Sequence, residues 1–200
     1  MTSQKTILRQ SLQNRVRQIS PQDRSALSVQ ARSLLKRQPV WQRARIILFY
    51  APLKDEVDIW PLVADALAEK KIAVLPQFNP KINHYVGCQI TDLENDLAPG
   101  RFGIPEPKDH CAEILLNRLD LALVPGVGFD PMGRRLGRGK GFYDRLLAQI
   151  SGTKCGVGFD EQIVETIPTE PHDVHLNCIL TPTRWLPVPA CAGFNEFFGP

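Results

Sequence analysis

Glycines alternate with basic side chains between residues 123 and 147, in a pattern typical of loops that bind phosphate. The glycines are Gly126, Gly128, Gly133, Gly137, Gly139 and Gly141, and the cations between them are Arg134, Arg135, Arg138 and Lys140. Glycine lets a backbone approach a ligand closely, because no Cβ intervenes. Backbone amides, guanidinium groups and a lysine ammonium group together bind the oxygens of a polyphosphate. The sequence therefore predicts a phosphate-binding loop.

The residues around this loop predict a strand before it and a helix after it. Leu121 to Val124 form an apolar run that Pro125 ends, as expected of a buried strand. Phe142, Leu146 and Ile150 follow at helical spacing. The last amides of the loop would then lie at a helix N-terminus, which favours anions.

Two common nucleotide-binding patterns do not match this loop. A Walker A loop would require glycine in place of Arg134 and Ser or Thr in place of Gly141. A Rossmann fingerprint requires a third glycine at a spacing that this loop lacks. The residue pattern alone leaves three interpretations open: nucleotide or phosphate binding, a flexible basic surface loop, and contact with nucleic acid.

Apolar periodicity elsewhere predicts alternating helices and strands. Two helices are expected at 5–19 and 20–37, with Ser20 as the cap of the second and Pro39 ending it. Asp58 is expected to cap a third helix. The further predicted helices span 58–70, 142–150 and 161–166, and the predicted strands span 45–50, 72–75, 84–90, 121–124, 154–159 and 177–180.

This order of elements predicts an α/β fold, a three-layer sandwich with a mostly parallel sheet preceded by an N-terminal helical hairpin. We expect a single domain over residues 1–200. Its parts would be the hairpin at about 4–38, the α/β core at about 45–182 and a C-terminal tail at 183–200. Ligands of such folds bind beyond the carboxyl ends of the strands.

The composition of the chain predicts a soluble protein of the cytoplasm. Of its 200 residues, 43% are hydrophobic and 22% are charged, and no apolar run is long enough to span a membrane. Five cysteines without a C-x-x-C pair indicate reduced thiols, and no zinc site is expected from their spacing. Residues 1–45 carry ten Lys or Arg against the single acid Asp23. This segment is interpreted as a solvated basic helix face, with a transit peptide as the alternative.

The order of residues in the glycine-rich loop closely resembles the signature of 5-formyltetrahydrofolate cyclo-ligases, also called methenyltetrahydrofolate synthetases. The resemblance is carried by Val124-Pro-Gly126, Phe129-Asp130, Gly133 and the run from Arg135 to Asp144. It extends from Lys5 to about Pro182. It implies ATP- and Mg²⁺-dependent conversion of 5-formyltetrahydrofolate to 5,10-methenyltetrahydrofolate, with release of ADP and phosphate, through a phosphorylated formyl intermediate.

The same resemblance assigns roles to individual residues. Lys140 and Arg138 would be catalytic, and Asp144 and Asp173 would hold Mg²⁺. The implied ATP-binding residues are Lys5, Arg9, Arg135, Leu136, Gly137, Arg138, Gly139, Lys140, Gly141, Phe142 and Tyr143. The implied substrate-binding residues are Leu53, Glu56, Asp58, Arg138, Gly139, Lys140, Gly141 and Phe142.

Three positions depart from the family pattern, and two others keep a structural alternative. Asp58, Phe142 and Asn177 stand where family members commonly have Glu, Tyr and Asp. A loss of charge at Asn177 would weaken Mg²⁺ binding if that position supports the metal. Glu106 is either a pocket residue or part of a rigid connector, and Tyr143 either stacks on a ligand ring or packs its helix.

Two other classes of function remain as alternatives. A basic nucleic-acid-binding module predicts affinity that falls steeply with salt and no ATP turnover. A folate- or nucleotide-binding protein without catalysis would keep the phosphate loop and lose the metal. The preferred interpretation is a monomeric enzyme of small-molecule substrates, with no nucleic-acid or membrane partner.

Overall fold

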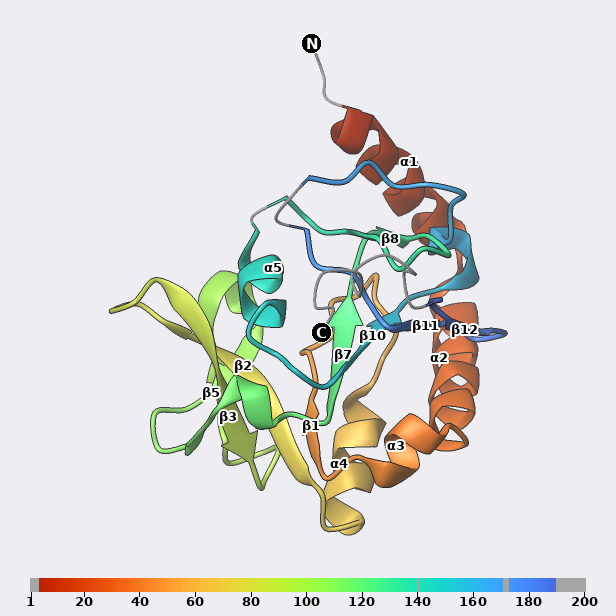
Figure 1. The fold of residues 1–200 in the computed structure, drawn as a ribbon. Coiled ribbons are helices and arrows are strands. Elements are labelled where there is room, and N and C mark those ends of the chain that lie inside the picture. Colours follow the sequence, from red (N-terminus) through yellow and green to blue (C-terminus); the bar gives the residue numbers. More distant parts are fainter. Residues whose placement is uncertain (1–3, 140, 171–172, 190–200) are drawn as a thin grey trace, which may run out of the picture.

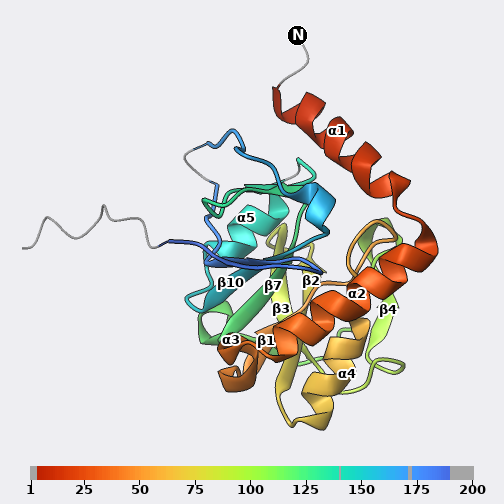
Figure 2. The ribbon, with the colours of Figure 1, turned by 90° about the vertical axis from the view of Figure 1, so that its right-hand side faces the viewer.

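A computed structural model describes residues 4–139, 141–170 and 173–189. A mixed sheet runs through the molecule with helices on both faces (Figures 1 and 2). The helices are α1 Gln4–Gln18, α2 Pro21–Lys36, α3 Pro39–Arg43, α4 Trp60–Ala68, α5 Phe142–Leu147 and the 3-10 turns η1 Arg101–Gly103, η2 Leu116–Arg118 and η3 Asp160–Gln162. The strands are β1 Ile46–Leu48, β2 Ile72–Asn79, β3 His84–Ile90, β4 Leu97–Pro99, β5 Pro105–Pro107, β6 Glu113–Ile114, β7 Leu121–Pro125, β8 Gly128–Phe129, β9 Arg135–Leu136, β10 Thr153–Val157, β11 Cys178–Leu180 and β12 Trp185–Pro187.

The main sheet has eight strands in the order β12-β11-β10-β7-β1-β2-β3-β6. The central five, from β11 to β2, are parallel, and the outer three pair antiparallel. After β1 the chain proceeds to β2 on one side, and after β7 it proceeds to β10 on the other. The strand order therefore reverses between β1 and β7, and ligands of open α/β sheets bind at such a point.

Helices cover the two faces of the sheet unequally. Helices α2, α3 and α4 bury Leu35, Trp41 and Leu62 against one face. On the opposite face, α5 buries Leu146 and Leu147. Figure 2 shows α2, α3 and α4 in front of the sheet and α5 behind it. The predicted three-layer α/β sandwich is therefore confirmed.

The N-terminal hairpin is also confirmed, and its two helices pack in different places. Ser20 caps α2, because its Oγ accepts the Asp23 N–H at 3.1 Å. Helix α2 lies on the sheet, whereas α1 contacts η3. On α1, the fully buried Leu12 packs with Val127, Leu136 and Ile167 in a small cluster of its own. Figure 2 shows α1 extending beyond the sheet.

Several local predictions were wrong. Residues 161–166 form no α-helix, since only the short turn η3 is present. Strand β2 continues through Pro76 to Asn79. Its pairing with β3 extends to Asn79, beyond the end of its pairing with β1. Residues 185–187, expected in a tail, form the edge strand β12. Pro39 opens α3 instead of only ending the previous helix, as proline often does at a first helical position.

None of the helices in the described part of the chain combines the length and apolar character needed to cross a membrane.

Candidate active site

A cavity of about 670 Å³ lies between the loops after β1 and β7, beside Pro76 of β2. This volume falls within the range of small-molecule sites, roughly 300–1,000 Å³. Among its lining residues are the predicted Lys5, Arg9, Leu53, Glu56, Arg135, Leu136, Gly137, Arg138, Gly139, Gly141, Tyr143, Asp144 and Asp173. Segments from both ends of the chain thus meet at the reversal point of the strand order.

The loop after β7 is held in shape by the buried carboxylate of Asp130. Its Oδ1 accepts the N–H groups of Met132 and Arg134, at 3.0 and 3.1 Å. Its Oδ2 accepts the Ile167 N–H at 2.9 Å. Because Asp130 has no exposed surface, these bonds are protected from water. They fix the β8–β9 hairpin against the segment that leads to Asp173.

Arg135 lies under the cavity and is almost fully buried, with 4% of its side chain exposed. Its Nη2 donates to Asp144 Oδ1 at 2.8 Å, and its Nη1 donates to the Pro125 carbonyl at 3.3 Å. The Arg135 Nε is buried, and none of the residues that the structure describes accepts a hydrogen bond from it. A buried unsatisfied donor costs free energy, so an acceptor supplied by a ligand would be favourable here.

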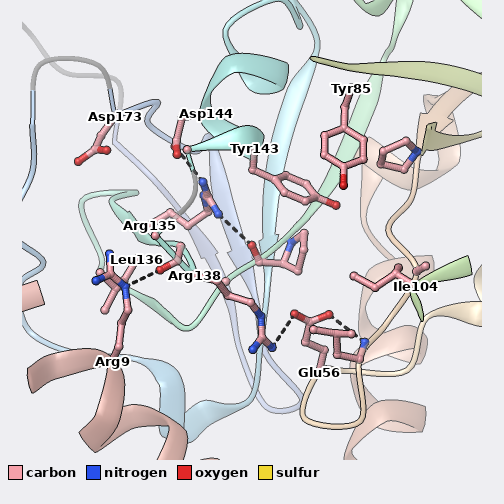
Figure 3. A pocket seen from close by; sticks show the side chains of 18 of the residues that line it. Arg9, Glu56, Tyr85, Ile104, Arg135, Leu136, Arg138, Tyr143, Asp144 and Asp173 are labelled. Atoms are coloured by element: carbon pink, nitrogen blue, oxygen red, sulfur yellow. Dashed lines mark hydrogen bonds and ion pairs between the residues drawn. The ribbon is translucent and has the colours of Figure 1, made fainter. Parts of the chain in front are cut away.

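Arg138 crosses from this loop to the loop after β1 (Figure 3). Its Nη2 donates to Asp55 Oδ1 at 2.8 Å and to Glu56 Oε1 at 3.0 Å. Burial raises the pKa of Glu56, although the Leu53 N–H and Arg138 oppose this shift. Burial alone would lower the pKa of Arg138, but Glu56 and Asp55 raise it, so the guanidinium stays charged.

The loop after β1 is braced from inside the core. The hydroxyl of the buried Tyr50 donates to the Val57 carbonyl at 2.8 Å. Glu56 Oε2 in turn accepts the Leu53 N–H at 3.0 Å. These two bonds fix the position of Leu53 and Glu56 at the cavity wall.

Helix α1 contributes two cations to the same cavity. The Lys5 Nζ donates to Asp173 Oδ2 at 3.0 Å, and the Arg9 Nε donates to the Gly137 carbonyl at 2.8 Å. Arg9 also lies against Gly139, whose φ of 96° favours glycine. Helix α1 therefore closes one side of the cavity.

The cavity has a charged end and an aromatic end (Figure 3). Arg9, Asp144 and Asp173 lie at the first, and Tyr85, Tyr143 and Ile104 lie at the second. Burial raises the pKa of Tyr143 far above that of a free phenol, so its hydroxyl stays neutral. One end of the cavity suits phosphates and the other suits a flat, weakly polar ring.

The two acids predicted to hold Mg²⁺ line the charged end. The side chains of Asp144 and Asp173 are both 17% exposed, and carboxylate oxygens are the ligands that Mg²⁺ prefers. In this structure the two carboxylates pair with Arg135 and Lys5. Their donor chemistry and shared cavity fit Mg²⁺, with these two cations as alternative partners of the same oxygens.

Other predicted residues lie elsewhere. Asp58, predicted to bind substrate, does not line the cavity, and its carboxylate faces Arg32. Asp58 was also predicted to cap a helix. Its carboxylate accepts the Trp60 N–H at 3.1 Å, but the N-cap residue of α4 is Ile59. Lys140 lies outside the described residues, as does the side chain of Phe142, whose backbone opens α5. Arg134 points away from the cavity and donates to Thr166 Oγ1 at 3.0 Å.

Asn177 and Glu106 have structural partners. The Asn177 Oδ1 accepts the Lys154 N–H at 2.8 Å beside the start of β11, and Asn177 is absent from the cavity wall. Glu106 does line the cavity, but its two carboxylate oxygens accept the Phe78 and Arg101 N–H groups, at 2.9 and 3.1 Å. Glu106 thus stabilises the β4–β5 hairpin where that hairpin meets the cavity.

Sequence reasoning predicted Tyr143 but missed Tyr85 and Ile104 at the aromatic end of the cavity. These two residues come from β3 and the β4–β5 hairpin, which pack beside the parallel strands. Nothing in their local pattern distinguishes them from ordinary strand and loop residues. Pro76 carried a weak signal, because the loop after the second predicted strand was expected at the same edge of the sheet.

The fold and the site define an α/β protein with a cavity for an anionic, ring-bearing ligand at the reversal point of its sheet. Comparison with known proteins gives the family. The sequence profile of the 5-formyltetrahydrofolate cyclo-ligase family matches residues 1–182. The chain belongs to this family.

Individual relatives agree with this assignment. The 5-formyltetrahydrofolate cyclo-ligase of Escherichia coli (strain K12) is 30% identical over 177 residues, which cover 86% of this chain and 97% of the relative. The Mus musculus protein of the same name is 28% identical over 191 residues, covering 90% and 94%. The NMR structure of Aquifex aeolicus 5,10-methenyltetrahydrofolate synthetase superposes with a TM-score of 0.86 at 30% identity, covering 98% of each chain.

Proposed function

We propose that this protein converts 5-formyltetrahydrofolate to 5,10-methenyltetrahydrofolate in a reaction that consumes ATP and requires Mg²⁺. The proposal rests on the family membership of the chain. The observation that supports it is that one cavity has both a charged end and an aromatic end, with Arg138 between them. ATP phosphates would bind at the first and the pterin at the second.

The chemistry requires activation of the formyl group, because an amide is a poor electrophile with a poor leaving group. The formyl oxygen attacks the γ-phosphorus of ATP, and ADP leaves. The neighbouring amine nitrogen then attacks the formyl carbon and loses its proton. The carbon–oxygen bond breaks, phosphate departs, and the ring closes as the methenyl product.

The residues of this chain provide position and positive charge for the phosphoryl transfer. Arg138 and Arg135, with Lys140 by family resemblance, would stabilise the charge that develops on the transferred phosphoryl group. Lys5 and Arg9 would hold the triphosphate from α1. Leu53 and Glu56 lie where the pterin would enter and would orient it.

Asp144 and Asp173 would hold Mg²⁺, which neutralises phosphate charge when it is bound. Arg135 and Lys5, which pair with these carboxylates here, line the same cavity and would be available to contact the phosphates. The unsatisfied Arg135 Nε offers a donor for a ligand oxygen.

A binding protein without catalysis would lack the metal, and the uncharged Asn177 would favour this alternative if its position supported Mg²⁺. Its amide pairs with Lys154 beside β11 and is absent from the cavity wall. That observation removes the support for the second function.

Isotope transfer tests the proposed intermediate. With substrate carrying oxygen-18 in the formyl group, the phosphate released should contain one labelled oxygen, because that oxygen leaves bound to phosphorus. Unlabelled phosphate formed in step with the methenyl product would rule out the intermediate.

The variant Lys140→Ala should stay folded by circular dichroism and nearly lose turnover; full activity would remove Lys140 from the mechanism.

A further inference from the structure

Three side chains outside the cavity form a compact cluster of potential metal ligands. Asp96, His110 and Cys111 each offer one ligand atom, and these atoms all lie within 4.8 Å of one another. The His110 Nε2 and Asp96 Oδ1 are 3.0 Å apart. We propose that this cluster is a site for a thiolate-binding divalent cation of the Zn²⁺ type, separate from the proposed Mg²⁺ site.

The Asp96 carboxylate is held in the way that metal ligands commonly are. Its Oδ2 accepts three hydrogen bonds, from Thr91 N at 2.7 Å, Thr91 Oγ1 at 2.9 Å and Asp92 N at 2.9 Å. Among the residues that the structure describes, Oδ1 contacts His110 within the cluster. Hydrogen bonds to the outer oxygen fix a ligating carboxylate and raise metal affinity.

The backbone holds the other two ligands in place. The Lys108 N–H donates to the Asp96 carbonyl at 2.8 Å, and the Cys111 N–H donates to the Lys108 carbonyl at 3.0 Å. The segment that carries His110 and Cys111 is therefore joined to the residue that supplies the carboxylate. Little backbone ordering would be needed when a cation binds.

The donor set selects the class of metal. Imidazole nitrogen, thiolate sulfur and carboxylate oxygen suit tetrahedral Zn²⁺, with water as a fourth ligand, whereas Mg²⁺ prefers oxygen alone. The free Cys111 thiol donates weakly to the Asp96 carbonyl at 3.6 Å. On binding, the thiol proton passes to solvent and sulfur coordinates the cation. His110 is 60% exposed in its side chain, which gives the ion access.

The position of the cluster gives the site a structural role. Asp96 immediately precedes β4, and His110 follows β5 by three residues. A bound cation would close the base of the β4–β5 hairpin. The same hairpin brings Ile104 and Glu106 to the wall of the large cavity. The inference does not depend on which reaction that cavity performs.

Co²⁺ titration of the full-length protein tests the proposal, because tetrahedral thiolate–Co²⁺ gives a near-ultraviolet charge-transfer band and strong visible bands. We expect one equivalent of Co²⁺ to produce both, Zn²⁺ to abolish them and Mg²⁺ to leave them unchanged. Cys111→Ser should lose the charge-transfer band, and His110→Ala should lose the tetrahedral visible bands. The matched controls Cys88→Ser and His175→Ala, at a thiol and an imidazole outside the cluster, should retain both.

The same titration can overturn the proposal. Absence of the bands in the unaltered protein would do so, as would bands that survive in Cys111→Ser or disappear in Cys88→Ser. Circular dichroism of each variant checks the fold. A rise in melting temperature with Zn²⁺ in the unaltered protein, absent in His110→Ala, is the second expected result, and an equal rise in both would contradict the site.

Discussion

Arg138 contacts carboxylates in the structure, whereas its proposed role is to bind phosphate. Asp55 and Glu56 hold its guanidinium at 2.8 and 3.0 Å. These acids keep Arg138 charged and direct it across the cavity. A phosphate group would compete for the same donors, and bidentate contact with arginine suits it well.

Arg138→Ala should lower kcat/KM by about a hundredfold, or roughly 2.7 kcal/mol of transition-state stabilisation, since a preorganised cation is lost. Steady-state kinetics for both substrates measures the change. Arg138→Lys should recover only part of the rate, because an ammonium group lacks the fork. Arg118→Ala is the control and should behave like the unaltered enzyme, because Arg118 lies on η2, before the N-terminal end of β7 and thus at the end of the strand opposite the cavity. Equal activity of Arg138→Ala and this control would refute the role.

The buried Glu56 should make stability depend on pH. Burial raises its pKa above the ordinary value of 4.5, so the folded state binds its proton more tightly than the unfolded state. The contribution of Glu56 to the free energy of unfolding is then lost as pH rises from the pKa of the unfolded state through the higher pKa of the folded state. Urea unfolding across that window should show a smaller loss of stability with rising pH in Glu56→Gln. Parallel profiles for the two proteins would contradict this assignment.

Asn177 should have no part in metal binding. Its Oδ1 accepts a backbone N–H from Lys154, and an aspartate oxygen could accept the same bond. The half-saturating Mg²⁺ concentration of Asn177→Asp should therefore equal that of the unaltered enzyme. A clear decrease would show that the charge reaches the metal after all.

At the scale of elements, helix α1 brings two cations to the site, since it carries Lys5 and Arg9 to the cavity. Of its two buried residues, Val16 packs in the main core, whereas Leu12, which lies nearer to the cations, packs in a small separate cluster. The Leu12 side chain lies directly over Gly128, where an added Cβ would come within 2.5 Å of Leu12 Cδ1. The position of the two cations therefore depends on this contact.

Leu12→Ala should loosen α1, because deleting a buried leucine typically costs about 2–5 kcal/mol. We expect faster hydrogen exchange in α1 and a higher KM for ATP, with a smaller change in kcat. Ile7→Ala is the matched control on the same helix, since Ile7 is 58% exposed. If both variants show the same KM despite faster exchange in Leu12→Ala, α1 does not position the nucleotide.

Residue patterns within single helices and strands were enough to predict most of the elements that form the three layers. The apolar runs at 45–50, 72–75 and 121–124 predicted the buried parallel strands β1, β2 and β7, and Ser20 predicted a helix start. The short strands β4, β5, β8 and β9 were missed, because two or three residues carry no periodicity. The helix expected at 161–166 failed because Gln162 turns inward and donates to the Gly126 and Val127 carbonyls.

At the scale of the whole molecule, the site exists because strand order reverses between β1 and β7. The glycine-rich loop and its cations could be predicted from sequence, since their chemistry is local. Tyr85, Ile104 and the Asp96 cluster could not, because they depend on the antiparallel β3 and the β4–β5 hairpin folding beside the parallel strands. Lys5 and Asp173, which are far apart in the sequence, were predicted as site residues only through family resemblance. The structure places Lys5 Nζ 3.0 Å from Asp173 Oδ2.

The appearance of 5,10-methenyltetrahydrofolate absorbance from 5-formyltetrahydrofolate tests the central claim most directly. Our account predicts product only when ATP and Mg²⁺ are both present, with one ADP formed for each methenyl group. Product formed at the same rate without ATP, or no product with all components present, would contradict it.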